Sequence, residues 1–181
     1  MSKALYVGSF DPFTNGHLNV LKHASTIFDE VIICVMTNPQ KKRFIDTQTT
    51  EAIINEILIN IYLPRNNVKL ITASTNLAYK HAKLCNCDYL VRGIRNNGLD
   101  YTYEENYADF NKEMGNINTI FIRADVNKNI CSTMIRTLLS NGEDIKPYIP
   151  LEVYNHLKEI YIWLLESQVN QALVKQPWPN N

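Results

Sequence analysis

The chain has 181 residues, with 18 basic and 18 acidic side chains, so its formal net charge is zero when the four histidines are neutral. Proteins that mainly hold DNA or RNA usually carry a basic surplus, so this balance argues against a nucleic-acid-binding protein. The longest apolar runs, such as residues 31–36, are too short to span a bilayer, and we see no signal-peptide core. We therefore expect a cytoplasmic protein with one domain over residues 1–165 and a polar tail over residues 166–181.

Short β-rich runs alternate with helical patterns along the whole chain. The expected strands are apolar and rich in β-branched and aromatic residues, and they cover residues 5–7, 31–36, 68–71, 89–91 and 120–122. The expected helices cover residues 16–28, 49–63, 77–84, 103–114, 132–139 and 151–165. This alternation predicts an α/β fold: a Rossmann-like open parallel five-stranded sheet with helices on both faces. Ligands of such sheets bind at the carboxyl ends of the strands.

The first strand leads directly into the sequence Gly8-Ser9-Phe10-Asp11-Pro12-Phe13-Thr14-Asn15-Gly16-His17. Its glycines allow close approach of the backbone, and the start of the next helix offers N–H groups to a phosphate. Considered alone, these residues are equally typical of an ordinary turn. The whole string, however, resembles the T/HxGH signature of the nucleotidyltransferase superfamily, with Thr14 and His17 at its outer positions.

Basic residues follow the second and fourth expected strands. Lys41, within a run of three cations, and the pair Arg92 and Arg95 could bind phosphate oxygens. The ordinary alternatives are a solvated basic loop and arginines that pair with nearby carboxylates such as Glu104.

Hydroxyl and amide side chains follow the fifth expected strand, over residues 127–133. Ser132 or Thr133 could simply cap the next helix, or the same groups could hold the β- and γ-phosphates of a nucleotide. Polar segments of this kind at four strand ends are hard to explain as turns alone.

Taken together, these segments resemble the bacterial phosphopantetheine adenylyltransferase family from about residue 5 to about residue 164. The shared strings are the Gly8 to His17 segment, Asn38-Pro39-Gln40-Lys41-Lys42, Val91-Arg92-Gly93-Ile94-Arg95, Asp100-Tyr101-Thr102-Tyr103-Glu104 with Asn111-Lys112, and Ile130-Cys131-Ser132-Thr133. The arginine string and the acidic-aromatic string after it are what indicate this member of the superfamily.

The resemblance implies a role for each matching residue. Catalysis would involve His17, Lys41 and Arg92. The ATP site would comprise Ser9, Phe10, His17, Gly93, Ile94, Arg95, Glu104, Asn127, Lys128, Asn129, Ile130, Cys131, Ser132 and Thr133. The 4′-phosphopantetheine site would comprise Ser9, Lys41, Leu77, Ala78, Arg92 and Asn111. Mg²⁺ arriving with ATP, homohexameric assembly and inhibition by coenzyme A are further implications, and we expect no metal site made by the protein alone.

The sequence departs from the family pattern at several positions. Ser9 stands where threonine is usual, and Cys131 replaces a usual serine, which weakens the expectation of a side-chain hydrogen bond there. The segment 96–98 carries one additional residue, and residues 49–52 lack the usual acidic-acidic-arginine helix start.

The expected reaction is attack by the acceptor phosphate on the α-phosphorus of ATP, with pyrophosphate as the leaving group. A phosphate is already anionic at neutral pH, so the protein has to position two polyanions and neutralise their charge. Two other functions stay open: a nicotinamide mononucleotide adenylyltransferase, favoured by the string from Cys131 to Arg136, and a module that binds adenine nucleotides without catalysis.

Overall fold

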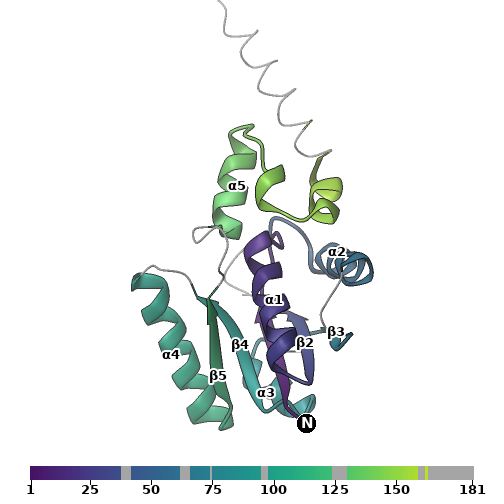
Figure 1. The fold of residues 1–181 in the computed structure, drawn as a ribbon. Helices are drawn as coiled ribbons and strands as arrows, with labels where there is room; N and C mark the ends of the chain where they lie inside the picture. Colours follow the sequence, from purple (N-terminus) through teal and green to yellow (C-terminus); the bar gives the residue numbers. More distant parts are fainter. Residues whose placement is uncertain are drawn as a thin grey trace, which may run out of the picture.

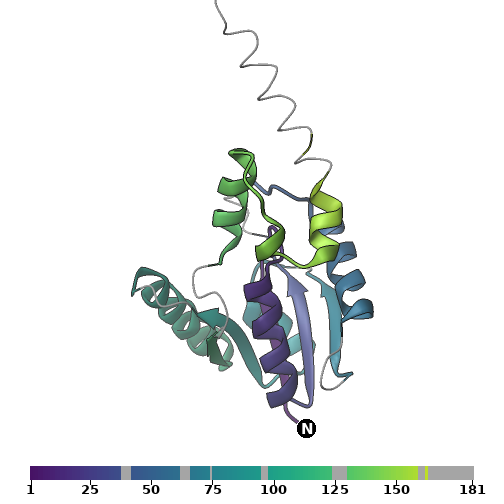
Figure 2. The ribbon, with the colours of Figure 1, turned by 45° about the horizontal axis from the view of Figure 1, so that its top comes forward.

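The computed structural model describes residues 1–37, 42–61, 66–73, 75–94, 98–123, 130–158 and 162, with the backbone alone at 98–100. A parallel sheet carries helices on both faces, which confirms the predicted fold class (Figures 1 and 2). Its strands are β1 (Lys3–Gly8), β2 (Glu30–Val35), β3 (Val68–Thr72), β4 (Tyr89–Ile94) and β5 (Asn118–Arg123). The helices are α1 (Asn15–Ile27), α2 (Thr47–Asn60), α3 (Ala78–Leu84), α4 (Gly98–Gly115) and α5 (Ser132–Ser140).

The strand order of the sheet is β3-β2-β1-β4-β5, and all four pairings are parallel. The chain moves outward from β1 through β2 to β3, then crosses to β4 on the other side of β1 and continues to β5. The order therefore reverses between β1 and β4, and a crevice at the carboxyl ends of these two strands is the usual ligand site of such a sheet. The segment from α5 to residue 158 lies beyond those carboxyl ends (Figures 1 and 2).

The side chains of β1 alternate between two hydrophobic cores, one on each face of the sheet. Ala4 and Tyr6 pack in a core with buried residues of α1, α2 and α5, whereas Leu5 and Val7 pack in a second core with residues of α3. Successive strand residues point to opposite faces, so a strand covered on both sides must be apolar throughout. This is why the strands read as continuous apolar runs in the sequence.

Side chains set the ends of several helices. The α2 helix begins at Thr47, earlier than predicted, because the Asp46 carboxylate accepts the Thr49 N–H over 2.8 Å. The α4 helix likewise begins at Gly98 rather than at residue 103. A short 3₁₀ turn at Lys146–Tyr148 was not predicted, and it leads into the helical residues 151–158.

The α5 helix ends close to the position predicted. Gly142 follows it with a φ of 73°, a left-handed conformation in which a Cβ atom is strained. Among the helices that the structure describes, none has both the length and the apolar character needed to cross a bilayer.

Candidate active site

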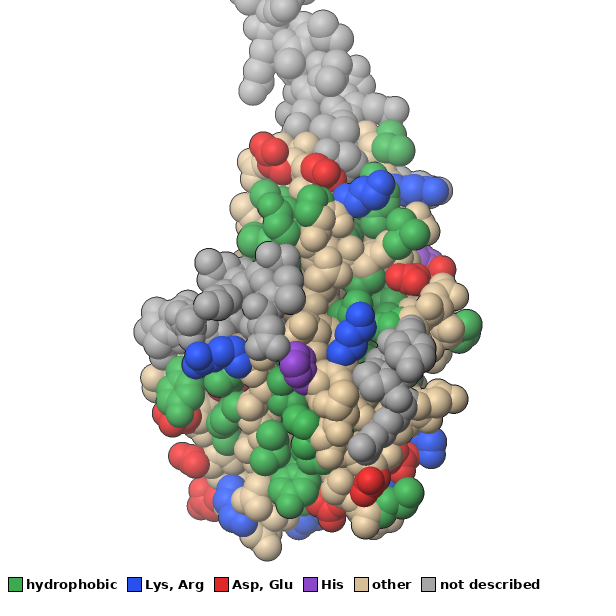
Figure 3. Space-filling model, viewed as in Figure 1, with side chains coloured by type: hydrophobic (Ala, Val, Ile, Leu, Met, Phe, Trp, Pro, Cys, Tyr) green, Lys and Arg blue, Asp and Glu red, His purple; other side chains and the backbone are tan. Residues whose placement is uncertain are grey.

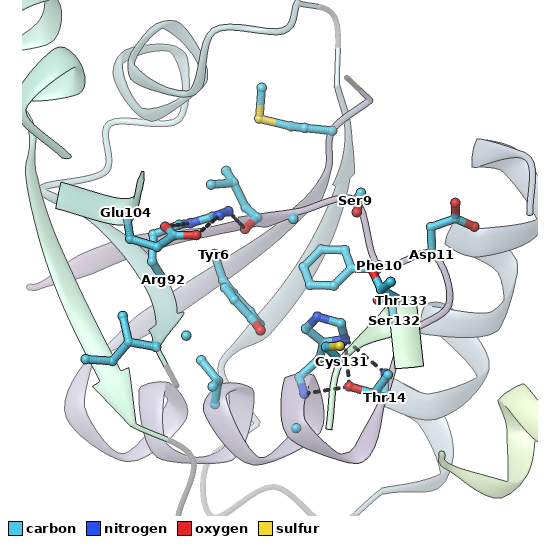
Figure 4. Close-up of a pocket in the computed structure, with 18 of the residues that line it drawn as sticks. Tyr6, Ser9, Phe10, Asp11, Thr14, Arg92, Glu104, Cys131, Ser132 and Thr133 are labelled. Carbon is cyan, nitrogen blue, oxygen red and sulfur yellow. Dashed lines mark hydrogen bonds and ion pairs between the residues drawn. The ribbon is translucent and has the colours of Figure 1, made fainter. Parts of the chain in front are cut away.

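A cavity of about 540 Å³ lies where the carboxyl ends of β1 and β4 meet the starts of α1 and α5. Its walls include the predicted site residues Ser9, Phe10, His17, Arg92, Gly93, Ile94, Glu104, Ile130, Cys131, Ser132 and Thr133. Figure 4 shows Arg92 and Glu104 on one side and Thr14 with Cys131, Ser132 and Thr133 on the other, with Tyr6 and Phe10 between them. Segments far apart in the sequence therefore converge on one cavity at the predicted edge of the sheet.

Three predicted acceptor-site residues do not line this cavity. Leu77 precedes the first residue of α3, and Ala78 is buried in the second core. Asn111 is fully buried and joins two helices: its Oδ1 accepts the Tyr79 N–H, and its Nδ2 donates to the Tyr107 carbonyl. The remaining predicted residues lie outside the described part of the chain, namely Lys41, Arg95, Asn127, Lys128 and Asn129.

The imidazole of His17 is held at the start of α1 by a reciprocal capping arrangement. Nδ1 accepts the backbone N–H of Thr14 over 3.0 Å, while the His17 N–H donates to the Thr14 hydroxyl over 3.3 Å. Since Nδ1 is an acceptor, a neutral imidazole carries its proton on Nε2. The rings of Phe10 and Phe13 lie 5.2 and 5.5 Å from the imidazole centroid and limit its rotation. The spacing of the two outer signature residues thus fixes both the tautomer and the direction of the ring.

The loop between β1 and α1 is attached to the segment after β2 through Asp11 and Arg43. The buried Asp11 carboxylate accepts the N–H groups of Phe44 and Ile45 over 2.8 and 2.7 Å. The Arg43 guanidinium donates from Nη2 to the Ser9 carbonyl over 2.9 Å and from Nε to the Ile45 carbonyl over 2.8 Å. These contacts hold the signature loop in place beneath the cavity.

The same loop is also attached to α5. Arg136 donates from Nη1 to the Asp11 carbonyl over 2.6 Å, and the Ser132 hydroxyl donates to the Pro12 carbonyl over 2.9 Å. Thr133 accepts from Arg136 Nη2 over 3.1 Å. The hydroxyl groups that the sequence suggested as a helix cap therefore have other partners.

The N-terminal cap of α5 is Cys131, and not Ser132 or Thr133. Its sulfur accepts the Met134 N–H over 3.3 Å, so the thiol occupies the capping position. The expectation that cysteine would weaken a side-chain hydrogen bond here is met only in part, because the contact is present and made through sulfur.

Two glycines allow the backbone to approach closely around the cavity. A Cβ atom on Gly8 would lie 2.8 Å from the ring of Phe10, whose own backbone has the left-handed φ of 47°. A Cβ atom on Gly93 would lie 2.9 Å from Val20 Cγ2 on α1. The second contact shows that Gly93 lets β4 pack closely against α1.

Arg92 extends from β4 toward α4 and pairs with Glu104. Nε and Nη2 each donate to the Glu104 carboxylate over 2.6 Å, and Nη1 donates to the Val7 carbonyl over 2.8 Å. Burial on its own would lower the pKa of Arg92, but the hydrogen bonds and charge of Glu104 outweigh burial and raise that pKa. The pairing with a carboxylate that the sequence left as an alternative is therefore present in the structure.

The cavity is basic although the chain as a whole is neutral. Among the described residues, its walls carry the cationic side chains Lys42, Arg43, Arg92, Arg123 and Arg136 and the carboxylates Asp11 and Glu104. Figure 3 shows histidine and basic side chains together near the centre of one face of the molecule. A concave surface with this surplus attracts anions.

Sequence reasoning missed several residues that line the cavity or attach its loops. Arg136 and Asp11 were quoted only within motifs, and Arg43 only within a run of cations. Their carbonyl and amide partners lie on other segments, so their roles depend on contacts that spacing does not reveal. Tyr107 and Asn76 also line the cavity and had no signal beyond their strand-end or helix positions.

Comparison with known proteins agrees with this geometry. The model of the cytidylyltransferase-like family matches residues 5–138. A phosphopantetheine adenylyltransferase of Lacticaseibacillus paracasei is 38% identical over 152 residues, covering 83% of this chain and 88% of that protein. A phosphopantetheine adenylyltransferase of Shouchella clausii is 32% identical over 163 residues, covering 89% and 99%.

Solved structures that resemble this chain share its fold at low sequence identity. Nicotinic acid mononucleotide adenylyltransferase of Plasmodium falciparum, solved with NaAD, has a TM-score of 0.61 at 16% identity over 88% of this chain and 95% of that one. The bifunctional NMN adenylyltransferase/ADP ribose pyrophosphatase of Francisella tularensis has a TM-score of 0.62 at 20% identity over 99% of this chain and 58% of that one. These likenesses show the fold alone. The family match and the identity of 32–38% to curated relatives over most of the chain show that it belongs to the phosphopantetheine adenylyltransferase family of nucleotidyltransferases.

Proposed function

We propose that this chain transfers the adenylyl group of ATP to 4′-phosphopantetheine and releases dephospho-coenzyme A and pyrophosphate. The observation that carries the proposal is the convergence of His17, Arg92 and the start of α5 on one basic cavity at the switch point of the sheet. The relatives at 32–38% identity, named for this activity, favour 4′-phosphopantetheine as the acceptor.

In the proposed reaction an oxygen of the acceptor phosphate forms a bond to the α-phosphorus of ATP. The bond from that phosphorus to the bridging oxygen of the β-phosphate breaks, and pyrophosphate leaves with the electron pair. No general base is needed, because the attacking phosphate is already ionised. Catalysis then depends on holding the two reactants in line and on stabilising charge as it develops.

His17 would stabilise the α-phosphate during transfer. With Nδ1 held by Thr14, the Nε2–H group is the donor that a phosphate oxygen can receive. The capping contact and the neighbouring aromatic rings fix this donor before the substrates bind, so little reorganisation is required when charge develops.

We propose that Ser132, Thr133 and the start of α5 receive the triphosphate, and that Arg92 with Lys41 receives the acceptor phosphate. N–H groups at a helix start and the positive end of its dipole suit an anion. Arg92 lies on the opposite side of the cavity from the start of α5, so two anionic ligands could be held with their reacting groups between them (Figure 4).

Mg²⁺ is best regarded as part of the nucleotide substrate. The two carboxylates in the described cavity walls are already engaged, Asp11 by two backbone N–H groups and Glu104 by Arg92. We therefore propose that the ion enters bound to ATP and offsets triphosphate charge, as Mg²⁺ does in many phosphoryl transfers.

Homohexameric assembly, inhibition by coenzyme A and a cytoplasmic location stay predictions of the family resemblance. Sedimentation of the purified chain and inhibition of turnover by coenzyme A would test the first two of these directly.

The test of the proposed function is pyrophosphate release from ATP and Mg²⁺ with 4′-phosphopantetheine or with nicotinamide mononucleotide. Release with 4′-phosphopantetheine alone is expected. Release with nicotinamide mononucleotide would transfer the assignment to the alternative suggested by residues 131–136. Nucleotide binding without release in either reaction would favour the non-catalytic binding module.

A further inference from the structure

Helix α4 presents two side chains, one turn apart, to the guanidinium of Arg92. Glu104 binds its edge through two hydrogen bonds of 2.6 Å, and the ring centroid of Tyr107 lies 5.1 Å from its central carbon. Residues three apart lie on the same face of a helix, so both groups reach Arg92 from α4. The Val7 carbonyl binds Nη1 from β1, and Arg92 is therefore held along its edge, across its face and at one terminal nitrogen.

Arg92 still has donors for a ligand after these contacts. A guanidinium carries five N–H groups, one on Nε and two on each terminal nitrogen. Glu104 and Val7 use one on each of the three nitrogens, which leaves one on Nη1 and one on Nη2. Two N–H groups on neighbouring terminal nitrogens match two oxygens of a phosphate. Pairing with Glu104 and binding of a phosphate are therefore compatible.

The position of Tyr107 is itself fixed. Asn111 Nδ2 donates to the Tyr107 carbonyl over 2.6 Å, and Asn111 Oδ1 accepts the Tyr79 N–H over 3.1 Å, which attaches this turn of α4 to α3. Burial raises the pKa of Tyr107, so its ring faces Arg92 as a neutral phenol. Asn111, expected from the family resemblance to touch the acceptor, here supports the residue that packs against Arg92.

We infer that Tyr107 is a positioning residue for the acceptor phosphate: its ring holds the face of Arg92, so that the two remaining N–H groups point to one place in the cavity. The inference rests on the proposed function and extends it to a residue that makes no contact with the reacting atoms. Without the ring, the guanidinium can tilt about its contacts with Glu104, and the phosphate loses a bidentate partner. The rest of the acceptor should bind as before.

The test compares 4′-phosphopantetheine with unphosphorylated pantetheine, measured as substrate and as inhibitor of pyrophosphate release. Tyr107→Leu should raise KM for 4′-phosphopantetheine about 3- to 30-fold, the range of a cation–π contact, with kcat within about twofold. Inhibition by pantetheine should stay unchanged, because pantetheine lacks the phosphate. Tyr107→Phe keeps the ring and should recover most of the lost affinity.

Phe110→Leu is the matched control, since Phe110 lies on the same helix, is 42% exposed and does not line the cavity. It should change neither ligand. Tyr107→Met, with a side chain closer in volume, repeats the test if Tyr107→Leu folds poorly by circular dichroism.

Equal losses for both ligands would assign Tyr107 a general structural role, and wild-type KM values in both the leucine and methionine variants would also overturn the inference. Either result would leave the proposed function standing if the wild-type chain turns over 4′-phosphopantetheine. A wild-type chain that releases no pyrophosphate with this acceptor would overturn the proposed function, and the inference with it.

Discussion

Replacing His17 by asparagine removes the ring nitrogen Nε2 but keeps an oxygen acceptor attached to Cγ, where Nδ1 stands in the wild type. The contact with the Thr14 N–H, 3.0 Å long in the structure, can therefore persist in this variant. Replacement by alanine removes the proposed phosphate donor and the capping contact together. The two variants separate the chemistry of the residue from its effect on the start of α1.

The structure sets the expected size of each effect. Loss of one preorganised donor to developing charge lowers kcat about 100- to 1,000-fold, or about 2.7–4 kcal/mol of activation free energy. Both variants should show this loss, with KM values changed only a few-fold. The alanine variant also loses a hydrogen bond that contributes about 0.5–1.5 kcal/mol to folding. At about 2–4 °C per kcal/mol for a chain of this size, its unfolding midpoint should fall about 1–6 °C below that of the asparagine variant.

The assay is steady-state pyrophosphate release with each substrate varied in turn, together with thermal unfolding of all three proteins. A kcat for His17→Asn within tenfold of the wild type would refute the assignment of His17 to the transition state. A loss of kcat in the alanine variant alone would show instead that the cap, and not the donor, matters for turnover.

Four further predictions concern stability. Asp11→Ala leaves two backbone N–H groups without their carboxylate and should cost about 2–6 kcal/mol in urea unfolding. Cys131→Ser places a better capping atom at the start of α5 and should raise the unfolding midpoint by about 1–4 °C. Gly93→Ala should cost about 1–3 kcal/mol by overpacking against Val20, and Gly93→Ala combined with Val20→Ala should cost less than the sum of the single changes. Hydrogen bonds from two lysines lower the pKa of Glu30, so Glu30→Gln should lose about 0.2–1 kcal/mol at pH 7 and nothing below about pH 3, because this stabilisation exists above the ordinary carboxyl pKa and vanishes as pH falls through the lowered one.

Each of these predictions has its own check. Asp88→Ala removes a single hydrogen bond to an exposed backbone N–H and should cost less than about 1.5 kcal/mol; a similar cost for Asp11→Ala would contradict the role of Asp11 as an anchor. A lower midpoint for Cys131→Ser would show that the sulfur contact is not a cap. Additive costs at Gly93 and Val20 would mean that their close approach is not the source of the strain. A stability difference for Glu30→Gln that persists at pH 3 would exclude the ion pairs as its cause.

The order of elements and the location of the site could be predicted because local pattern decides both. Strands buried on both faces must be apolar at every position, and their alternation with helical spacing leaves a parallel sheet as the consistent fold. Parallel strands bring their carboxyl ends to one edge, so polar segments after each strand had to meet there. His17 could be placed in the site from the sequence because its signature spacing also forms the cap of α1.

Other features depended on contacts between segments distant in the sequence. Whether Arg92 has donors left beside Glu104, and which ring covers its face, depends on how α4 packs against β4. The removal of Asn111 from the cavity wall has the same origin, since its amide joins α4 to α3.

The sequence by itself thus determined the α/β fold, the family and the edge of the sheet where ligands bind, because these follow from periodicity and from motifs that are contiguous in the chain. Only the tertiary structure decided which polar side chains face the cavity and which serve as anchors, as Asp11 and Arg43 do. A side chain's role is set by the partners within hydrogen-bond reach, and for these residues those partners come from other segments of the fold.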